Sequence, residues 1–491
     1  MTDLRNTIQN KFDPSKRFPN YGDIITRIST QGFRCHSNTV VDIRSPITAF
    51  CGLNGTGKST LLQLAATAYQ SPDKESIPHF HISDFMVVGT LDPTPFTENA
   101  RVEYRYWQVD RETRTTTLSR NAHSSRWSGY GRRPQRIVFF TGVGHYLPKI
   151  EQRDFVVQYA KHLDISNTTP VPDEVRSWTS TILSCGYDEI VSNTVDYSRN
   201  KSHRIGEVVS ANRYGATYSE AHMGYGEGRT LYLVSSIEKL PQKSLILLEE
   251  PETSLHPGAQ HQLGKYLVDV VSRKGHQIML TTHSMFLLTA LPSQSIVYLK
   301  RKTDGIEPVR NMTPVEIRSL LADGHVKALY VLVEDNCAQA ILREIIRRLD
   351  PDFLRVIEIH CGERGLSADT IATIVRSLKE TKVPIAGVRD GDMPAIASDN
   401  IFKLPGNLPP EKELFAHPSV RALIETTYGV RLSDFETTIV AADHHDWFNS
   451  LGQHVNHDPS VLLNEAARVY ASSLPENEIT TLIRLLKEAT Q

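Results

Sequence analysis

The sequence of 491 residues has few cysteines and no long apolar segment. Its five cysteines form no C-x-x-C pair, so we expect free thiols in a reducing compartment, without disulfides or a cysteine-based zinc site. No apolar run approaches the roughly 20 residues that a membrane-spanning helix needs. The N-terminal stretch also lacks the apolar region of a secretory signal. We therefore expect a cytoplasmic protein that has no membrane partner.

The sequence also has no charge excess, internal repeat, low-complexity tract or long heptad run. A formal net charge of −2 neither favours nor excludes nucleic acid as a partner. Because 40% of the residues are hydrophobic and 22% are charged, the chain has the composition of a globular protein. Its length predicts two or three domains. The missing heptads exclude a full coiled-coil arm.

A complete phosphate-binding loop motif, G-x-x-x-x-G-K-[ST], occupies residues 52–59. It lies between a predicted strand over 47–51 and a predicted helix from residue 60, which is the context that the motif requires. Glycines let backbone N–H groups turn toward phosphates, and the helix N-terminus favours negative charge. Lys58 is expected to reach the β- and γ-phosphates of ATP, and Ser59 to hold Mg²⁺. The other nucleotide-binding residues that we expect here are Asn54, Gly55, Gly57 and Thr60.

An apolar run over 245–248 ends in two adjacent carboxylates, Glu249 and Glu250. The run predicts a buried central strand of a parallel sheet. Two charges at the end of such a strand need a cationic partner. An ATPase places acids there for Mg²⁺ and for the attacking water, so we expect Glu249 near the metal.

Three further segments follow the order of motifs in one class of ATPase. The sequence MGYGEG occupies 223–228, PETSLHP follows Glu250, and a predicted strand over 277–282 ends in His283. With the acidic strand at 245–250, this series resembles the ABC-type ATPases of the repair and chromosome-maintenance kind. The chain departs from that family at Glu249, where aspartate is usual.

The ABC-type resemblance implies specific roles and a homodimer or higher homo-oligomer. It makes Glu250 the residue that polarises water and His283 the switch that contacts the γ-phosphate. It also implies that the signature of one subunit closes over ATP bound to the other, through Gly224, Gly226 and Glu227. An isolated monomer is then expected to bind ATP and to hydrolyse it poorly.

The pattern of alternating strands and helices restarts near residue 323. Predicted strands over 328–333, 356–359 and 383–388 alternate with helical segments. The first strand is followed by Glu334, and the last by Asp390 and Asp392. Because parallel strands bring their C-terminal ends to one edge, we expect these three acids to converge on a divalent cation.

This arrangement resembles the TOPRIM fold of topoisomerases, primases and OLD-family nucleases. In that family the acids hold Mg²⁺, with Mn²⁺ as an alternative, for phosphodiester cleavage. An ABC-type ATPase followed by TOPRIM is the layout of OLD-family nucleases and of related anti-phage systems, including Gabija-type nucleases and Septu-type ATPases. Two positions depart from the OLD pattern: Asp335 replaces a glycine, and Ala338 replaces another acid.

The resemblance implies an α/β protein with three parts. Residues 1–322 form an ABC-type P-loop ATPase domain with an antiparallel β subdomain. Residues 323–425 form a smaller Rossmann-like TOPRIM domain. Residues 426–491 form a helical C-terminal region, which includes an amphipathic helix over 479–487.

Three other segments leave alternatives open. Arginines interleaved with tyrosine and tryptophan suggest either a DNA-binding surface or a solvated face or subunit interface. Glu411 and Lys412 are either the extra acid and lysine of a nuclease site or, as we favour, charges in the first turn of a helix. His444, His445, His454 and His457 are interpreted as surface or interface histidines in preference to metal ligands. The arginines are Arg101, Arg105, Arg111, Arg114, Arg120, Arg126, Arg132, Arg133 and Arg136.

Three functional hypotheses follow from the motifs and the resemblances. The first is a cytoplasmic ATPase of an anti-phage defence system, whose nucleotide state controls DNA cleavage by its own TOPRIM domain. The second is a Septu-like regulatory ATPase with a degenerate TOPRIM domain, which controls a separate HNH nuclease. The third is a DNA-repair ATPase that binds DNA without cutting it. The short segment between the phosphate-binding loop and the signature argues against the third.

Overall fold

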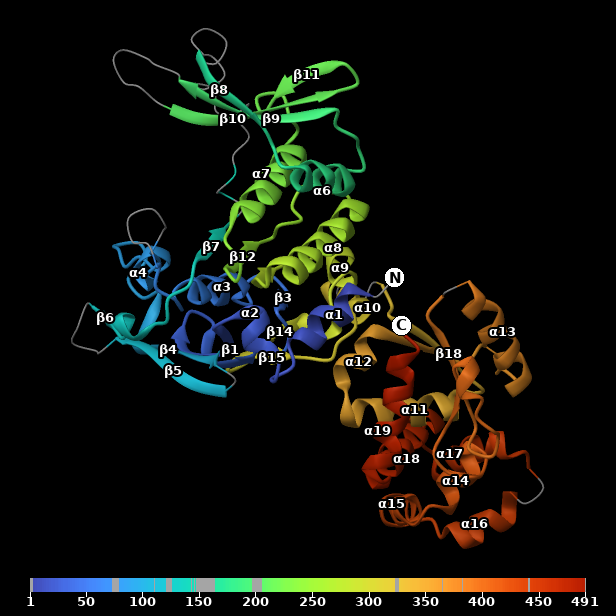
Figure 1. Cartoon of the computed structure of the whole chain (residues 1–491). Helices are drawn as coiled ribbons and strands as arrows, with labels where there is room; N and C mark the ends of the chain where they lie inside the picture. Colours follow the sequence, from blue (N-terminus) through green and yellow to red (C-terminus); the bar gives the residue numbers. More distant parts are fainter. Residues whose placement is uncertain are drawn as a thin grey trace. The chain divides into compact units, whose positions relative to one another are not determined.

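The computed structural model describes residues 3–72, 79–109, 111–120, 126–142, 144, 146, 164–196, 205–322, 326–363, 365–381, 383–439 and 442–490 (Figure 1). The chain divides into two compact units, Met1–Met312 and Thr313–Gln491. Helix α10 (Pro314–Leu321), which the sequence analysis assigned to the first domain, belongs to the second unit. All five cysteines are free, as predicted. Among the described residues, no helix is both long and apolar enough to cross a membrane.

The first unit is built around a six-stranded sheet of order β15-β14-β3-β13-β12-β7. Its strands are parallel except β15, which pairs antiparallel with β14 at one edge. The predicted strand over 47–51 is confirmed as β3, and all five of its residues are buried. Strand β13 lies between β3 and β12, so three motif-bearing strands end side by side at one edge. The six strands are β3 (Ile47–Cys51), β7 (Val138–Thr141), β12 (Leu245–Glu249), β13 (Gln277–Thr281), β14 (Ile296–Lys302) and β15 (Gly305–Val309).

Helices surround this sheet, and α8 shows how the sequence sets their ends. Its N-cap His256 accepts a hydrogen bond from the Ala259 N–H, a proline occupies the first turn, and Gly275 ends it with a left-handed φ of 64°. Helix α8 packs against α1, α6 and α9. The helices of this unit are α1 (Leu4–Lys11), α2 (Arg17–Tyr21), α3 (Lys58–Ala66), α4 (Ile82–Phe85), α6 (Asp173–Leu183), α7 (Tyr225–Lys239), α8 (Pro257–Lys274), α9 (Met285–Thr289), η1 (Tyr130–Arg132) and η4 (Ser293–Ser295).

A five-stranded antiparallel sheet of order β2-β1-β4-β5-β6 packs on the helix that follows the phosphate-binding loop. Residues alternate along β4, so Tyr104 and Tyr106 are fully buried. Their hydroxyls donate to the Leu64 and Ala68 carbonyls, each over 2.6 Å. The sheet therefore supports α3 directly. Its strands are β1 (Ile24–Phe33), β2 (His36–Asp42), β4 (Phe96–Gln108), β5 (Arg111–Arg120) and β6 (Trp127–Ser128).

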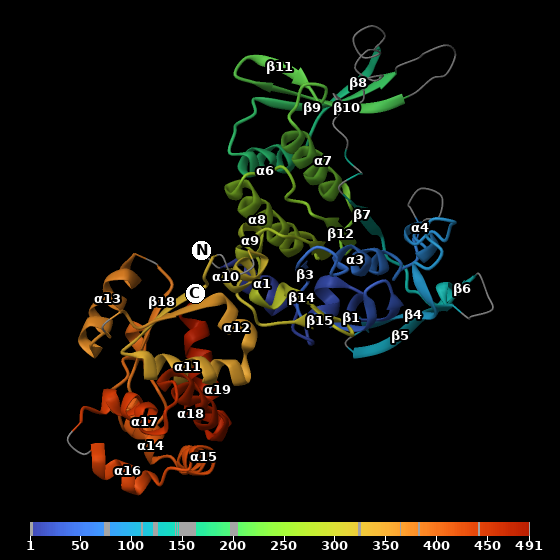
Figure 2. The same ribbon diagram turned by 180° about the vertical axis from the view of Figure 1, so that it is seen from behind.

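A four-stranded antiparallel sheet of order β11-β10-β9-β8 lies beside α6 and α7 (Figures 1 and 2). Its last strand leads within a few residues into the N-terminus of α7. This connection places the sheet next to the predicted signature. The strands are β8 (Asp164–Pro170), β9 (Glu189–Asp196), β10 (Ile205–Arg213) and β11 (Ala216–Ser219).

The second unit contains a four-stranded parallel sheet of order β17-β16-β18-β19. The predicted strands are found with small shifts of their ends, and Val356 is the last residue of helix α12 instead of the first of a strand. Because the sheet is parallel, all four strands end at the same edge. The strands are β16 (Leu329–Val333), β17 (Ile357–His360), β18 (Ile385–Arg389) and β19 (Ile401–Lys403).

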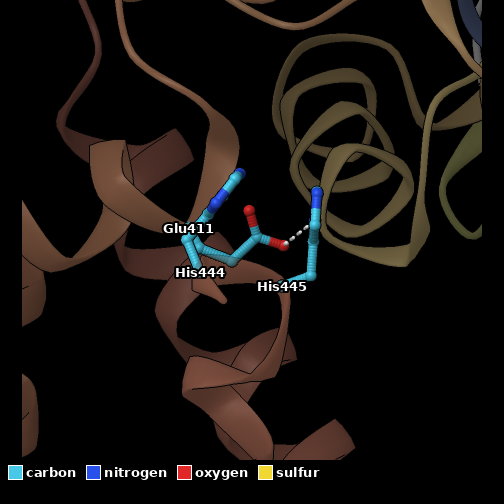
Figure 3. A group of neighbouring side chains, drawn as sticks. All are labelled: Glu411, His444 and His445. Atoms are coloured by element: carbon cyan, nitrogen blue, oxygen red, sulfur yellow. Dashed lines mark ion pairs between the residues drawn. The ribbon is translucent and has the colours of Figure 1, made fainter. Parts of the chain in front are cut away.

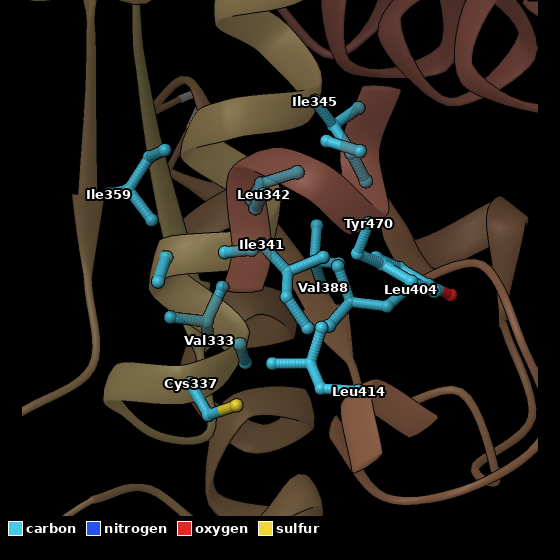
Figure 4. Packing of buried hydrophobic residues seen from close by; sticks show 14 of the residues in the cluster. Val333, Cys337, Ile341, Leu342, Ile345, Ile359, Val388, Leu404, Leu414 and Tyr470 are labelled. Atoms are coloured by element: carbon cyan, nitrogen blue, oxygen red, sulfur yellow. The ribbon is translucent and has the colours of Figure 1, made fainter. Parts of the chain in front are cut away.

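Side chains alternate across β16 and enter two different cores. Val331 and Val333 lie in a large cluster with α11 and the C-terminal helices (Figure 4). Leu332 lies in a smaller cluster with residues of α13. Fully burying each such side chain contributes about 1.5–3 kcal/mol to the free energy of unfolding. The helices are α10, α11 (Asn336–Leu349), α12 (Pro351–Val356), α13 (Ala368–Glu380), η5 (Ala397–Asp399), α14 (Pro410–Ala416), α15 (Pro418–Tyr428), α16 (Leu432–Ile439), η6 (His444–Asp446), α17 (Trp447–Val455), α18 (Pro459–Ser473) and α19 (Glu476–Glu488).

Candidate functional site

The phosphate-binding loop joins β3 to α3 in a conformation that its glycines permit. Gly52, Gly55 and Gly57 have φ values of 147°, 74° and 77°. A Cβ atom on Gly57 would lie 2.1 Å from His36 Nε2, so no larger residue fits there. Lys58 Nζ donates to the carbonyls of Gly52 and Leu53 over 3.0 and 3.1 Å. The loop therefore holds its lysine in place before any nucleotide binds.

The remaining predicted residues of the loop surround the N-terminus of α3. Ser59 is half-buried in the first turn of the helix, Thr60 is buried, and Asn54 and Gly55 are exposed. Sequence reasoning missed Arg301 on β14, whose guanidinium donates to the Asn54 and Gly55 carbonyls over 3.3 and 2.9 Å. An arginine far along the chain thus fixes the exposed part of the loop.

Glu250 is held in an unusual backbone conformation directly after β12. Its φ is 43°, in the left-handed region, where a residue other than glycine costs about 1–3 kcal/mol. Its N–H donates to both the carbonyl and the hydroxyl of Thr281 on β13, each over 3.1 Å. Strained residues of this kind concentrate at functional sites.

The three ionisable residues expected around the γ-phosphate are Lys58, Glu250 and His283, and they lie near one another. Glu250 Oε1 lies 3.6 Å from His283 Nε2. Burial and the charge of Lys58 lower the pKa of His283. Burial also lowers the pKa of Lys58, against the opposing effect of Glu250. The lysine at the start of α3, the carboxylate after β12 and the imidazole after β13 therefore belong to one site.

Glu252 is a further residue whose position sequence reasoning did not identify. It is 7% exposed, and its Oε1 accepts hydrogen bonds from the Thr282 hydroxyl and from the His283 N–H. Burial raises its pKa. The carboxylate of Glu252 thus fixes the backbone that carries His283. Only the tertiary fold distinguishes it from an exposed loop glutamate.

The predicted signature lies at the N-terminus of α7, with Gly224 as the N-cap. A Cβ atom on Gly226 would lie 2.6 Å from the Ser254 carbonyl oxygen, so the helix end packs closely on the loop after β12. Glu227 Oε1 accepts hydrogen bonds from the hydroxyls of Tyr187 and Tyr218 over 2.6 and 2.7 Å. Tyr218 of β11 and Tyr187, which precedes β9, therefore orient the glutamate of the signature.

The predicted acids of the second unit meet at one edge of its sheet. Glu334 follows β16 and Asp390 follows β18, and the Asp390 N–H donates to Glu334 Oε1 over 3.1 Å. Asp390 is 7% exposed, and its Oδ1 is buried without a hydrogen-bond partner among the described residues. Burial and four neighbouring carboxylates raise its pKa to about 8. Asp392 is exposed. Together with Glu334 and Asp390 it lines a cavity, called the acidic cavity below.

Two more carboxylates join this cluster. Asp335 is the N-cap of α11, where its Oδ1 accepts from the Ala338 N–H over 2.8 Å, and Ala338 is fully buried. Glu411, in the first turn of α14, is only 3% exposed, and burial followed by the charge of Asp335 raises its pKa to about 7. Glu411 therefore lies in the first turn of a helix, as the favoured interpretation expected, but it is buried in the acidic cluster. Lys412 does have the exposed position expected of that interpretation.

The structure separates the four histidines of the C-terminal region. His445 Nδ1 lies 3.3 Å from Asp335 Oδ2 and 3.7 Å from Glu411 Oε1. His444 also lines the acidic cavity, whose volume is about 1080 Å³. His454 and His457 are exposed residues outside it. The interpretation as surface histidines therefore holds for His454, His457 and the exposed His445, but His445 lines the acidic cavity together with the half-buried His444.

The arginine-rich segment is less open than its sequence suggests. Arg133 and Arg136 are 3% and 6% exposed, and both donate to backbone carbonyls. They are structural residues and cannot contribute to a DNA-binding surface. Arg101 and Arg105 lie on the face of β4 opposite the buried tyrosines. The side chains of Arg111 and Arg114 lie outside the described residues.

Two family models match the first unit. One, described as an AAA ATPase domain, matches residues 150–288, and another, described as an AAA domain, matches residues 27–135. No curated protein matches the sequence. With the geometry of the phosphate-binding loop, the family models identify the chain as an ATPase with a mixed α/β fold. Such a domain implies ATP, together with Mg²⁺, as its nucleotide ligand.

Solved structures that match part of the chain include heads of SMC proteins. The SMC head bound to the C-terminal winged-helix domain of ScpA is 12% identical, with a TM-score of 0.38, and the match covers 58% of this chain and 96% of that one. The SMC head domain from Thermotoga maritima is 15% identical, with a TM-score of 0.33, and the match covers 58% and 98%. The SMC head from Pyrococcus furiosus with an extended coiled coil is 10% identical, with a TM-score of 0.37, over 58% and 96%. Since all three TM-scores are below 0.5, the assignment as an ATPase rests on the family models and the site.

Proposed function

We propose that this chain is the ATPase component of a prokaryotic anti-phage defence system, and that its nucleotide state controls metal-dependent DNA cleavage by its own second unit. The ATPase activity follows from the family models and the phosphate-binding loop. The cleavage site in this proposal is the acidic sheet edge of a TOPRIM domain formed by Glu334, Asp390 and Asp392. The layout of an ATPase followed by this sheet, which resembles that of OLD-family nucleases, supports the defence role.

The observation that carries the proposal is the cluster of buried carboxylates at the ends of β16 and β18. The Asp390 N–H donates to Glu334 Oε1, which holds the two acids next to each other at the sheet edge. Burial and neighbouring carboxylates raise the pKa of both Asp390 and Glu334. The buried cation nearest to Asp390 in sequence, Arg389, donates instead to the carbonyls of Pro394 and Ala368. A buried cluster of negative charge calls for a divalent cation.

The residues present fit Mg²⁺ or Mn²⁺. Glu334, Asp390 and Asp392 supply the carboxylate oxygens that these hard cations prefer. When bound, the cation would stabilise negative charge on the attacking and leaving oxygens of a phosphodiester. Glu411 adds a buried carboxylate to the lining of the same cavity. The protein's own contribution is to hold these acids together and to exclude water from Asp390.

The control of cleavage is proposed to run through an ATP-dependent homodimer. Gly224, Gly226 and Glu227 would close over the ATP bound to the phosphate-binding loop of a second copy. Helix α7, whose N-terminus packs on Ser254, would then connect the nucleotide of one copy to the acidic strand end of the other. DNA is the proposed substrate, and Arg101 and Arg105 remain candidates for contacting its backbone.

One observation favours a second function. Asp335 is committed to capping α11, and Ala338 is fully buried and offers no ligand. The site therefore lacks a glycine and an acid that OLD-type nucleases carry. In this Septu-like alternative the second unit is degenerate and the chain regulates a separate HNH nuclease.

Cleavage of supercoiled plasmid by the full-length protein, with Mg²⁺ or Mn²⁺ and with or without ATP, tests the proposal. We expect nicking that is lost in Asp390→Ala and retained in Asp399→Ala, a surface acid of the same unit. Absence of cleavage under every condition, with ATP turnover intact, would overturn the nuclease and favour the regulatory alternative. In a bacterial host, phage protection that depends on both Lys58 and Asp390 would support the defence role.

A further inference from the structure

A second set of ligand atoms lies in the acidic cavity and contains nitrogen as well as oxygen. One ligand atom each of Glu411, His444 and His445 lies within 4.8 Å of the other two. Figure 3 shows the carboxylate of Glu411 between the two imidazole rings. Glu411 comes from the first turn of α14, and the histidines come from η6. Two separate elements therefore bring these three side chains together.

The carboxylate of Glu411 is buried, and one of its two oxygens lacks a hydrogen-bond partner among the described residues. Its residue is 3% exposed, and its Oε2 has no hydrogen-bond partner among the described residues. Its Oε1 lies 3.7 Å from His445 Nδ1. A charge-assisted hydrogen bond of this type is about 2.7–2.9 Å long, so the imidazole does not satisfy the carboxylate. A buried, unpaired carboxylate is costly unless a cation meets it.

Asp335 presents a second carboxylate near His445 Nδ1. Its Oδ1 is committed to the N-cap of α11, which fixes the side chain. Its Oδ2 is buried without a hydrogen-bond partner and lies 3.3 Å from His445 Nδ1. Carboxylate oxygens of Asp335 and Glu411 thus both lie near the same imidazole nitrogen.

We propose that Glu411, His444 and His445, with Asp335 as a fourth ligand, bind one Zn²⁺ ion. Imidazole nitrogen with carboxylate oxygen is a donor set that suits Zn²⁺, which takes four ligands at about 2.0–2.2 Å. Mg²⁺ prefers oxygen alone, as Glu334, Asp390 and Asp392 offer. The cavity therefore contains two chemically distinct cation sites. The histidine side chains are 25% and 53% exposed, which leaves them room to rotate onto a metal.

The Zn²⁺ site does not depend on DNA cleavage. A regulatory chain with a degenerate nuclease site would keep the same ligands. The test therefore measures metal retention directly, without nucleotide and without Mg²⁺, so that the ATP site contributes nothing.

Full-length protein stripped with a chelator is equilibrated with Zn²⁺, freed of unbound metal, and analysed for Zn²⁺ per chain. We expect one equivalent in the wild type, its loss in a His444→Ala/His445→Ala double variant, and its retention in His454→Ala. His454 is a matched control because it lies on the adjacent helix α17, outside the cavity. Equal retention by the wild type and the double variant would overturn the proposal, as would equal loss in the control.

X-ray absorption of the Zn²⁺-loaded wild type provides a measurement that does not require the variants to fold. The expected spectrum contains scattering from two imidazole rings together with oxygen ligands. A shell of oxygen alone would place Zn²⁺ on Glu334 and Asp390 and would overturn the assignment. Plasmid cleavage in Mg²⁺ is scored separately, so loss of the nuclease proposal and loss of the Zn²⁺ site give different results.

Discussion

Arg229 on α7 donates to the backbone carbonyls of both Glu249 and Glu250, over 3.1 and 2.8 Å. The arginine is 5% exposed, and it lies one turn beyond the glycines of the signature. It therefore joins the helix that is proposed to contact one nucleotide to the acids that act on another. Neither the signature motif nor the acidic strand motif indicates this connection in the sequence.

Replacing Arg229 is expected to weaken both stability and ATP turnover. Arg229→Ala removes two hydrogen bonds from a charged donor, each of which contributes about 1.5–3 kcal/mol. Arg229→Lys keeps the charge with fewer donors and should give an intermediate turnover at saturating ATP. Arg176→Ala is the control, because Arg176 is an exposed arginine on the neighbouring α6. Wild-type turnover in Arg229→Ala would show that this connection has no role in hydrolysis.

Glu250→Gln is expected to separate ATP binding from hydrolysis. The substitution preserves shape and removes the charge that polarises water, so turnover should fall by about 10²–10⁴. Binding should persist because the phosphate-binding loop is unchanged. Steady-state hydrolysis and gel filtration with ATP measure the two effects, and an ATP-bound dimer should accumulate. Undiminished turnover would assign the role of base to a different residue.

Gly226→Ala is expected to destabilise the protein more than Gly224→Ala. A Cβ atom at residue 226 would lie 2.6 Å from the Ser254 carbonyl oxygen, whereas one at residue 224 has no heavy atom within 4 Å. Gly224 also has a φ of −60°, which alanine adopts readily. Overpacking of this kind costs about 1–3 kcal/mol. Thermal unfolding of the two variants compares the effects, and equal melting temperatures would contradict the close packing.

The raised pKa of Asp390 predicts that stability falls as pH rises when no metal is present. Burial and neighbouring carboxylates raise this pKa to about 8, from 3.8 in the unfolded chain. Between these values the folded state binds more protons, so the free energy of unfolding decreases with pH until about pH 8. Denaturation in a chelator at several pH values between about 4 and 8 should show this decrease, and the free energy should level off above about pH 8.

Asp390→Asn should flatten that pH dependence, and Asp399→Asn should not. Arg376 lowers the pKa of Asp399, so the effect of Asp399 belongs to acidic pH. Because bound Mg²⁺ displaces the proton of Asp390, the affinity for Mg²⁺ should rise with pH toward about 8. A pH-independent affinity would indicate that Asp390 is not a ligand.

Local sequence was sufficient to predict the strands and helix starts that carry the ATPase motifs. Each ATPase motif is a short run in which a strand, a turn and a helix start are adjacent, and such contacts depend little on the rest of the chain. The parallel strands ending in Glu334 and Asp390 were also predicted from short apolar runs. The free cysteines were predicted from the absence of C-x-x-C pairs. The TOPRIM identity, the DNA substrate and the defence role stay predictions.

Only the tertiary structure decided what surrounds these motifs. It buries Glu411, brings His445 to Asp335, and removes Arg133 and Arg136 from the surface. It also joins Arg229 to Glu250 and Arg301 to the phosphate-binding loop. These pairs are separated by many residues, and helical or strand periodicity says nothing about which distant side chain fills a site. Burial and charge pairing are properties of the packed whole, so motif reading alone could not assign them.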